Sequence, residues 1–356
     1  MFYQCSRCKK IWQYPIEKCP DCFQNLESIP SRKIKVIGIS KVTIPTILHS
    51  KVPYFVLVLE DGNGNKWAQK SIKEYKVGEE WTPLDSKHLT GQSKNAVSIW
   101  RIKYDILEGI EKVVDLLGGL TINPQTKILI LPTLISPKHP YLAANTNPKF
   151  LESLIQYLVK IGGDVKNVKV VAQSFDETPI EASAQKSQLL DVCLKNQITP
   201  LDLAKSNFIK KEKESFSCEI SEEALNSDLI INLPILKLDA KTGIKGAAEN
   251  SLKLLKKESY LSLQYLSNPE EILEKTQEVL PNYLTVADAQ TIQKTSGFTA
   301  FLGVTLASFN PLNLDRAFAE ICMFKDLPEY LKKIKIEGVP IIGRAIEEVQ
   351  YEVEKF

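Results

Sequence analysis

The stretch Asp228–Leu252 reads DLIINLPILKLDAKTGIKGAAENSL, and within it the pattern changes from apolar to basic. Its first part, residues 229–233, is a short apolar run, which is typical of a strand buried on both faces in a parallel sheet. The second part predicts a polar loop rich in lysine and glycine, followed by a helix with apolar residues from Leu252 onward. Backbone N–H groups and a helix N-terminus beside lysines favour an anionic ligand.

The glycine spacing of this stretch does not identify the ligand, because it matches neither the Walker A nor the dinucleotide-binding pattern. An ordinary loop, with Thr242 as a helix cap and the lysines in solvent, is the alternative interpretation. If the stretch is a binding site, replacing Lys237 and Lys245 by alanine should weaken anion binding and leave the melting temperature almost unchanged.

From residue 99 onward the sequence alternates between strand and helix patterns. Three of the helices open with a capping Asn before a Pro at the first helical position, at Asn147-Pro148, Asn268-Pro269 and Asn310-Pro311. The alternation predicts an α/β domain over residues 99–356, with a mostly parallel sheet covered by helices on both faces. A helix is expected within residues 102–117, and the predicted strands are residues 128–131, 168–172, 229–233, 284–287, 301–307 and 339–342.

Ligands of such sheets bind beyond the carboxyl ends of the strands, so the candidate residues are those that follow each predicted strand. The predicted ligand-binding residues are Lys237, Asp239, Thr242, Gly243, Lys245, Gly246, Asn250, Ser174, Asp288 and Ser308. No nucleophile, base and orienting group stand at a recognisable spacing, so no catalytic residue is assigned and an enzymatic role stays open. Asp239 and Asp288 could instead hold Mg²⁺ with a phosphate. Asp315 is interpreted as a favourable charge in an early helical turn.

Four of the seven cysteines form two CxxC pairs near the N-terminus, Cys5 with Cys8 and Cys19 with Cys22. Two such pairs present four thiolates to one tetrahedral ion, so residues 1–30 are predicted to form a zinc ribbon. Zinc is preferred over iron because rubredoxin-type pairs usually carry a glycine after the second cysteine, whereas Lys9 and Phe23 stand there. Four protein ligands leave no open coordination position, so the metal is expected to be structural.

Residues 31–81 follow an all-β pattern and are predicted to form a small OB-like barrel. An alternating run over residues 33–44 is followed by an apolar strand over residues 53–60, a turn with two glycines, and a returning strand. Its aromatic residues could stack single-stranded nucleic acid, although such residues are more often barrel core. Residues 82–98 are polar without clear periodicity and are predicted to be a linker.

The overall charge gives no strong field, because 45 basic residues face 43 acidic ones and only five of the basic residues are Arg. This balance argues against a dedicated nucleic-acid-binding protein. No apolar stretch approaches the roughly 20 residues that a membrane helix needs. Since Cys5 is expected to bind metal, there is no room for a cleavable signal peptide, and a cytoplasmic location is expected.

The N-terminal 80 or so residues resemble the domain of unknown function family 35, a rubredoxin-like zinc ribbon followed by an OB-fold. The similar segments are CSRCKKIWQYPIEKCPDC (residues 5–22), VPYFVLVLEDGNGNKWAQ (52–69) and YKVGEEW (75–81). The resemblance implies an association with acyl-CoA and with thiolase-like partner proteins.

Residues 126–347 resemble the domain of unknown function family 362. The similar segments are LPTLISPKHP (131–140), NPKFLESLIQYLVKIGG (147–163), VKVVAQS (168–174), INLPILKLDAKTGIKGAAENSL (231–252), VADAQ (286–290) and LGVTLASFNPLNLDRAFAEI (302–321). The chain departs from the family pattern at several positions where the family carries charged residues, among them Asn147, Gln173, Glu249 and Asn310.

The leading hypothesis is a protein that binds a small anionic metabolite near residues 237–250, with acyl-CoA as one candidate. The first alternative is a non-enzymatic scaffold or adaptor for a thiolase-like partner, in which the departures from the family pattern record lost chemistry. The second is single-stranded nucleic-acid binding by the OB module, which requires an affinity that falls steeply with salt.

Overall fold

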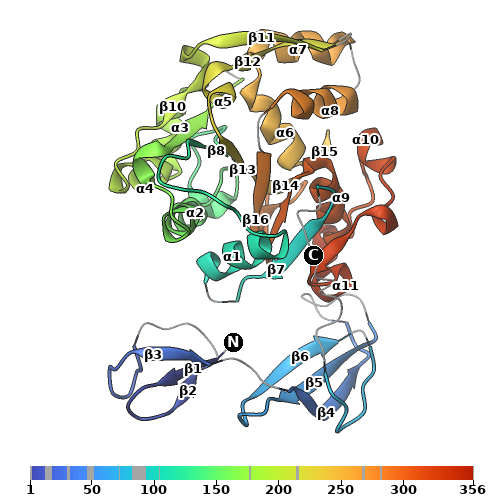
Figure 1. Cartoon of the computed structure of the whole chain (residues 1–356). Coiled ribbons are helices and arrows are strands. Elements are labelled where there is room, and N and C mark those ends of the chain that lie inside the picture. The colour runs from blue at the N-terminus through green and yellow to red at the C-terminus, as the bar shows by residue number, and fades with distance from the viewer. Residues whose placement is uncertain are drawn as a thin grey trace.

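A computed structural model of the protein describes eleven stretches of the chain (Figure 1). The described residues are 2–12, 18–29, 33–45, 52–71, 73–81, 94–103, 105–175, 178–213, 216–266, 269–280 and 283–355. Within them, none of the helices combines the length and the apolar character that crossing a membrane requires.

The N-terminal ribbon is a three-stranded antiparallel sheet with β1 in the middle. Its strands are β1 (Phe2–Cys5), β2 (Ile11–Trp12) and β3 (Leu26–Ile29). Cys5 ends β1, and the turn between β1 and β2 carries Cys8, so the strand pairing itself brings the first CxxC pair to one end of the sheet.

The second module is another antiparallel sheet, with β5 between β4 and β6. The strands are β4 (Lys35–Val42), β5 (Tyr54–Glu60) and β6 (Lys66–Ser71). Leu57 and Leu59 of β5 are buried with Tyr75 and Trp81, which come from the segment after β6. The aromatic residues of this segment are therefore part of the core. The closure into a barrel that an OB-fold requires stays a prediction.

The α/β domain is built on one large sheet, whose main path runs β10-β9-β8-β13-β16-β17-β7-β18. The strands from β10 to β16 are parallel, as predicted, whereas β17 and β7 each run antiparallel to the strand before them. The strands of the path are β7 (Val97–Arg101), β8 (Ile128–Pro132), β9 (Val168–Ala172), β10 (Leu201–Asp202), β13 (Leu229–Leu233), β16 (Tyr283–Gln293), β17 (Thr299–Ser308) and β18 (Ile341–Gly343). All six predicted strands are thus present, β16 and β17 being longer than expected.

Two hairpins were not predicted from the sequence. One joins β11 (Phe208–Lys213) to β12 (Phe216–Ser221), and the other joins β14 (Ile235–Asp239) to β15 (Gly243–Lys245). Strand β14 also pairs with β16, so the second hairpin belongs to the large sheet. The first two residues of β7 fall within the segment that was expected to be a linker.

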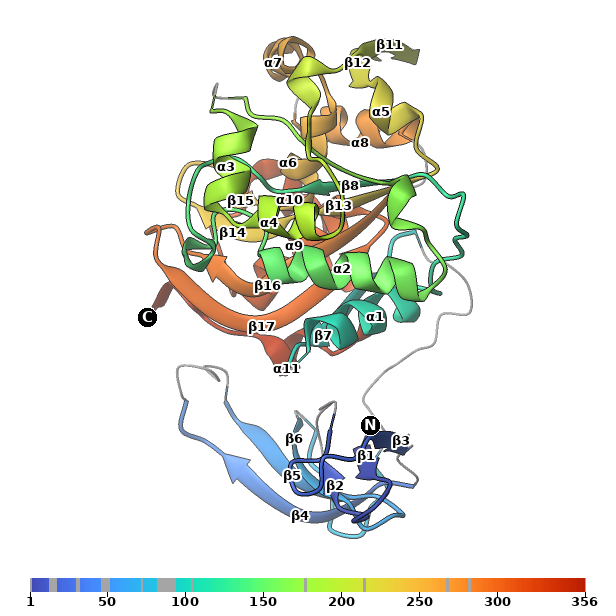
Figure 2. The same cartoon turned by 90° about the vertical axis from the view of Figure 1, so that its left-hand side faces the viewer.

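Both faces of the sheet are buried, because alternate residues of its central strands enter two different cores. In β13, Ile230 belongs to one core, and Leu229 and Ile231 belong to the other. Helices α1 and α2 lie side by side on one face (Figure 2), while α6 and α9 contribute to the core of the other. Full burial of each such side chain stabilises the fold by roughly 1.5–3 kcal/mol.

The helices of the domain are mostly short. The α-helices are α1 (Ile106–Leu116), α2 (Pro148–Lys160), α3 (Ile180–Lys186), α4 (Leu189–Lys195), α5 (Glu222–Leu225), α6 (Ala247–Ser251), α7 (Lys257–Leu266), α8 (Pro269–Val279), α9 (Pro311–Ile321), α10 (Glu329–Lys332) and α11 (Ile346–Val349). Single turns of 3-10 helix cover Pro140–Leu142, Val165–Asn167, Leu203–Lys205, Leu252–Leu254, Ile336–Gly338 and Val353–Lys355.

Two of the three predicted Asn-Pro helix starts are confirmed. The side-chain oxygen of Asn147 accepts a hydrogen bond from the backbone N–H of Lys149 at 2.9 Å, and Asn310 caps α9 in the same way. A proline occupies the first helical position in both cases, where no backbone N–H is needed. The third predicted cap, Asn268, lies outside the described residues.

Candidate functional site

A small cavity of about 240 Å³ lies where β8, β9 and β13 end. Thr133 follows β8, Ser174 lies just after β9, and Ile235 follows β13. The carboxyl ends of these parallel strands therefore meet at one edge of the sheet, as the sequence predicted, and the cavity sits in the position expected of a ligand site in such a fold. Its lining residues are Thr133, Ile135, Ser174, Phe175, Ile235, Lys237, Lys245, Gly246, Glu249, Asn250 and Lys253.

The stretch that was expected to be a polar loop is a β-hairpin, and this corrects the prediction. Lys237 faces Lys245 across the two strands, and Asp239 faces Gly243 next to the turn. The apolar residues between the polar ones explain the strand, because Leu236, Leu238 and Ile244 are all buried in one core. The alternation of lysines and apolar residues was therefore a strand pattern.

Asp239 and Thr242 build the turn of this hairpin. Oδ1 of Asp239 accepts hydrogen bonds from the backbone N–H groups of Lys241 and Thr242, at 3.0 and 2.9 Å, and from the Thr242 hydroxyl at 3.0 Å. Gly243 follows with a φ of +79°, and a Cβ there would lie 2.8 Å from the backbone oxygen of Asp326. Only glycine fits this close approach in the left-handed region. The three residues thus have a structural role, and Thr242 does not cap a helix.

Three lysines line the small cavity, against one carboxylate, that of Glu249. Lys237 donates a hydrogen bond from Nζ to the backbone oxygen of Ala144 at 3.0 Å. Lys245 forms an ion pair with Asp239 at 3.2 Å, and Nζ of Lys253 lies 3.7 Å from the ring centroid of Phe175. The excess of positive charge at a concave site favours an anionic ligand.

Lys237 is buried, with 6% of its surface exposed, and this differs from the exposed loop lysine that the sequence suggested. Burial lowers the pKa of Lys237 to about 8, because the charged ammonium loses its hydration, while Glu249 acts in the opposite direction. A lysine in this position affects the stability of the fold. The prediction that its replacement leaves the melting temperature unchanged is therefore withdrawn.

Replacing Lys237 by methionine is expected to raise the free energy of unfolding at about pH 7 by about 1–3 kcal/mol, since a buried charge with a depressed pKa is removed. Between about pH 8 and the unfolded pKa near 10.5, Lys237 is protonated in the unfolded chain but has lost its proton in the folded protein. The free energy of unfolding of the wild type therefore rises with pH in this range. Urea denaturation at about pH 7 and about pH 9.5 should show the difference between the two proteins shrinking at the higher pH.

The matched control for this measurement is Lys241→Met, because Lys241 is exposed on the adjacent hairpin turn. It should leave the pH dependence of the wild type unchanged. A Lys237→Met variant that is less stable than the wild type at neutral pH and keeps the same pH slope would show that the buried ammonium is stabilising.

Asn250 fixes helix α6 to the sheet. Its amide group donates to the backbone oxygen of Leu131 at 2.9 Å and to Oδ1 of Asn232 at 2.7 Å, and its oxygen accepts from the Thr133 hydroxyl at 3.0 Å. Both amide hydrogens are thereby used. Asn250 therefore has a structural role in the wall of the cavity.

Asp315 has a role that the sequence interpretation missed. Its carboxylate is fully buried and accepts hydrogen bonds from the backbone N–H groups of Ala247 at 2.7 Å and Ala248 at 2.9 Å. Burial raises the pKa of Asp315 to about 7, against the opposing effect of these two hydrogen bonds. Asp315 is thus no simple charge in α9. The first N–H groups of α6, which were expected to face an anion, are already bound to it.

Asp288 and Ser308, both predicted as ligand-binding, are not among the residues that line the cavity. Asp288 is buried in β16 and accepts hydrogen bonds from the backbone N–H groups of Asn147 and Gln290, at 3.3 and 3.0 Å, and burial raises its pKa to about 6. Ser308 is buried at the end of β17 and donates to the backbone oxygen of Ala96 at 2.7 Å. Both side chains hold neighbouring segments together.

Six of the eleven lining residues were not among the predicted ligand-binding residues, and these are Thr133, Ile135, Phe175, Ile235, Glu249 and Lys253. The sequence held a signal for two of them. Glu249 and Lys253 follow Gly246 by three and seven positions, which is the spacing of residues on one face of a helix. Phe175 gave no such signal, because it lies three residues beyond a predicted strand, in a stretch without any pattern of its own.

The four N-terminal cysteines come together as the sequence predicted. Their Sγ atoms lie within 4.8 Å of one another, with 3.3 Å between those of Cys5 and Cys22 and 3.6 Å between those of Cys8 and Cys19. Four sulfurs at the Zn–S distance of about 2.3 Å in a tetrahedron are about 3.8 Å apart, so the cluster fits one metal ion.

The backbone around the cysteines bears on which metal is bound. Lys9 and Phe23, which stand where rubredoxin-type pairs usually have glycine, have φ angles of 59° and 57°. They adopt the left-handed conformation that glycine would supply. The missing glycines therefore do not alter the geometry of the pairs, and they no longer discriminate zinc from iron.

Comparison with known families matches residues 128–320 to the family described as Domain of unknown function (DUF362). No curated protein matched the sequence. Among solved structures, the lactate racemase apoprotein from Thermoanaerobacterium thermosaccharolyticum is similar over 65% of this chain, with 13% identity and a TM-score of 0.39, and this chain spans 57% of the racemase. The Ltp2-ChsH2(DUF35) aldolase is similar over 24% of this chain and 75% of its own, with 19% identity and a TM-score of 0.19.

Proposed function

The chain belongs to the domain of unknown function family 362, and from the geometry at its sheet edge we propose that it binds a small anionic metabolite in the cavity lined by Lys237, Lys245 and Lys253. The observation that carries the proposal is the charge of this cavity. Three lysines and one carboxylate line it, and a second carboxylate, that of Asp239, pairs with Lys245, so an excess of positive charge remains. A phosphate or carboxylate group in it would receive charge-assisted hydrogen bonds, which are stronger than neutral ones.

The size of the cavity narrows the ligand class. At about 240 Å³ it is smaller than the roughly 300–1,000 Å³ of sites that enclose a whole drug-sized molecule. It suits a single phosphate, a carboxylate, or the anionic end of a longer molecule. An acyl-CoA would fit this proposal only with most of its length outside the small cavity.

The N-terminal modules extend the proposal. We propose that residues 1–30 hold one structural zinc ion on the four cysteines, and that residues 31–81 form a small OB-like module joined to the α/β domain by the residues that precede β7. The Sγ positions support the metal, and the resemblance to domain of unknown function family 35 supports zinc and a thiolase-like partner.

Replacing Lys245 or Lys253 by glutamine is expected to weaken the binding of inorganic phosphate and pyrophosphate about tenfold or more each. A hydrogen bond to a charged group contributes about 1.5–3 kcal/mol, and about 1.4 kcal/mol corresponds to a factor of ten in affinity. Isothermal titration calorimetry on the full chain, at constant ionic strength, measures this directly.

The control is Lys166→Gln, because Lys166 is exposed and lies just before β9, at the opposite edge of the sheet. It should bind phosphate as the wild type does. If the wild type binds neither anion, or if all three variants bind alike, the cavity is no anion site, and a scaffold or adaptor role becomes the better explanation.

A further inference from the structure

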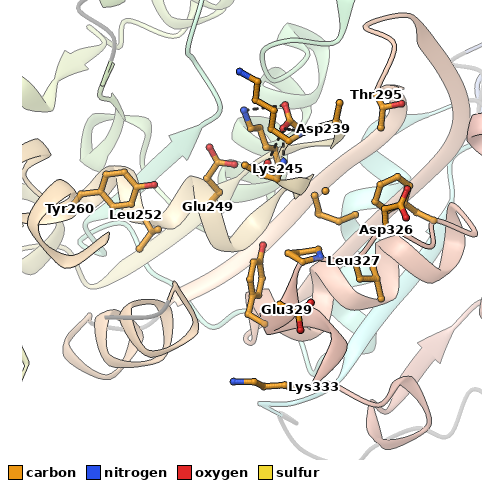
Figure 3. Close-up of a pocket in the computed structure, with 18 residues that line it drawn as sticks. Asp239, Lys245, Glu249, Leu252, Tyr260, Thr295, Asp326, Leu327, Glu329 and Lys333 are labelled. Carbon is orange, nitrogen blue, oxygen red and sulfur yellow. Dashed lines mark hydrogen bonds and ion pairs between the residues drawn. The ribbon is translucent and has the colours of Figure 1, made fainter. Parts of the chain in front are cut away.

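A second cavity of about 760 Å³, larger than the first, shares two lining residues with it, Lys245 and Glu249. Figure 3 shows the residues that line this larger cavity. It is bounded by the turn of the β14–β15 hairpin, by helix α6, and by the segment 324–333, which includes α10. Its other lining residues are not part of the small cavity.

Two features join the two cavities. Lys245 and Glu249 line both of them, so the end of β15 and one face of α6 form a shared wall. On another side, Phe175 of the small cavity stacks on Tyr260 of the large one, with ring centroids 4.9 Å apart and ring planes at 29°. The two cavities therefore adjoin at these residues.

The walls of the two cavities differ in chemistry. The large cavity combines four carboxylates with three lysines, so it lacks the cationic excess of the small one. Its apolar and aromatic lining residues are Ile244, Leu252, Tyr260, Phe324, Leu327, Pro328 and Tyr330. Such a surface suits a hydrocarbon or aromatic group, because burial of apolar area is favourable whatever the charge of the rest of the ligand.

We propose that the two cavities form one site for an elongated organic anion, whose charged group occupies the small cavity and whose apolar or aromatic body occupies the large one. This inference rests on the proposed function, because it takes the lysine-lined cavity as the place of the charged group. The large cavity alone lies within the size range of sites that enclose a whole small molecule, so the body of the ligand has room beside its charged group.

Glu249 gives the ligand a further property. Its carboxylate lies at the junction and makes no hydrogen bond or ion pair with another residue in the described part of the chain. An ionised carboxylate only accepts hydrogen bonds. A hydrogen-bond donor between the charged end and the apolar body of the ligand, such as a hydroxyl or an amide N–H, would face this carboxylate.

The test uses 8-anilinonaphthalene-1-sulfonate on the full chain, a probe with an anionic sulfonate, an aromatic body and an N–H group between its rings. Its fluorescence rises in an apolar site, so titration gives its affinity. Phosphate is expected to displace the probe, and Lys253→Gln is expected to weaken the binding of both phosphate and the probe. Tyr330→Ala should lower the affinity for the probe about fivefold or more, while the affinity for phosphate stays within about a factor of two of the wild-type value.

A second variant guards against a loss of folding in Tyr330→Ala. Leu327→Trp places a larger side chain in the large cavity instead of creating a gap. This variant should also bind the probe more weakly and bind phosphate as the wild type does. The control Ile44→Ala removes an exposed apolar side chain, 76% exposed in the second module, and should change neither affinity.

The outcomes separate the two proposals. If phosphate binding depends on the lysines but the probe is insensitive to both Tyr330→Ala and Leu327→Trp, the anion site stands and the joined site is wrong. If the probe depends on Tyr330 but neither competes with phosphate nor responds to Lys253→Gln, the two cavities bind independently, and the joined site is again wrong. If phosphate itself does not bind, the function proposed above fails first.

Discussion

Replacing Cys19 by serine is expected to release the bound metal and unfold the N-terminal ribbon, while the α/β domain keeps its fold. The ribbon has three short strands, and its buried residues include Phe2, Cys5 and Cys19, so little apolar area stabilises it. Structural zinc contributes roughly 10–16 kcal/mol in small zinc-finger domains, so metal binding is expected to supply most of the stability of a module of this size. Metal content by plasma mass spectrometry should fall from one ion per chain to none, and limited proteolysis should cut within residues 1–30.

The control variant is Cys193→Ser. Cys193 is buried in the core of the α/β domain and is not part of the cysteine cluster. It should retain the metal. Since Lys9 and Phe23 supply the left-handed backbone that iron- and zinc-binding pairs share, the metal found in the wild type, and not the sequence, decides between zinc and iron. A Cys19→Ser variant that keeps one ion per chain and stays resistant to protease would show that the cluster is not the metal site.

The parts of the fold that were predicted from the sequence are those that depend on local pattern. Strands β9 and β13 match their predicted bounds, because four of the five residues in each are apolar, as is typical of strands in a buried parallel sheet. The starts of α2 and α9 were predicted because an Asn cap followed by Pro satisfies the first turn of a helix whatever lies around it.

The parts that were missed depend on partners far away in the sequence. Strand β7 pairs with β17, whose residues come about 200 positions later, and its own five residues give no strand signal strong enough to outweigh a polar neighbourhood. In the β14–β15 hairpin a buried lysine hid the strand pattern, since Lys237 is polar by type but is held by the backbone oxygen of Ala144. Sequence patterns assume that polar residues face water.

The structure brings half of the predicted ligand-binding residues together at one cavity, and their role in binding stays a prediction. Five of the ten predicted ligand-binding residues line the small cavity, and these are Lys237, Lys245, Gly246, Asn250 and Ser174. The position followed from the topology of parallel strands. The choice of binding groups did not follow from the topology. The sequence offered both the lysines and the first backbone N–H groups of α6 as anion-binding groups. The structure shows that Asp315 already accepts hydrogen bonds from these N–H groups.

Replacing Gly246 by alanine is expected to destabilise the α/β domain by about 3 kcal/mol or more and to abolish phosphate binding. A Cβ at this position would lie 2.9 Å from Cγ of Asp315, closer still to its Oδ1, and 3.1 Å from Leu236. Either the carboxylate moves and loses its hydrogen bonds to Ala247 and Ala248, or the hairpin shifts away from α6. Overpacking costs about 1–3 kcal/mol, and each hydrogen bond to a charged group contributes about 1.5–3 kcal/mol.

Urea denaturation and phosphate titration measure both effects of Gly246→Ala. The matched control is Gly338→Ala, because a Cβ on Gly338 would meet no atom within 4 Å. That variant should change the free energy of unfolding by less than about 0.5 kcal/mol and leave phosphate binding intact. Equal effects of the two substitutions would mean that the tight contact at Gly246 is absent in solution.

The cause of the Gly246→Ala effect can be isolated with a double-mutant cycle. Asp315→Ala removes the carboxylate that occupies the space of the new Cβ, and it leaves the N–H groups of Ala247 and Ala248 without their acceptor. In the Asp315→Ala background, Gly246→Ala should destabilise the domain only a little further. The double variant should therefore lose about 1–3 kcal/mol less free energy of unfolding than the two single variants lose in sum. Strict additivity would instead place the strain on Leu236 and the hairpin, and Asp315 would then hold α6 without restricting position 246.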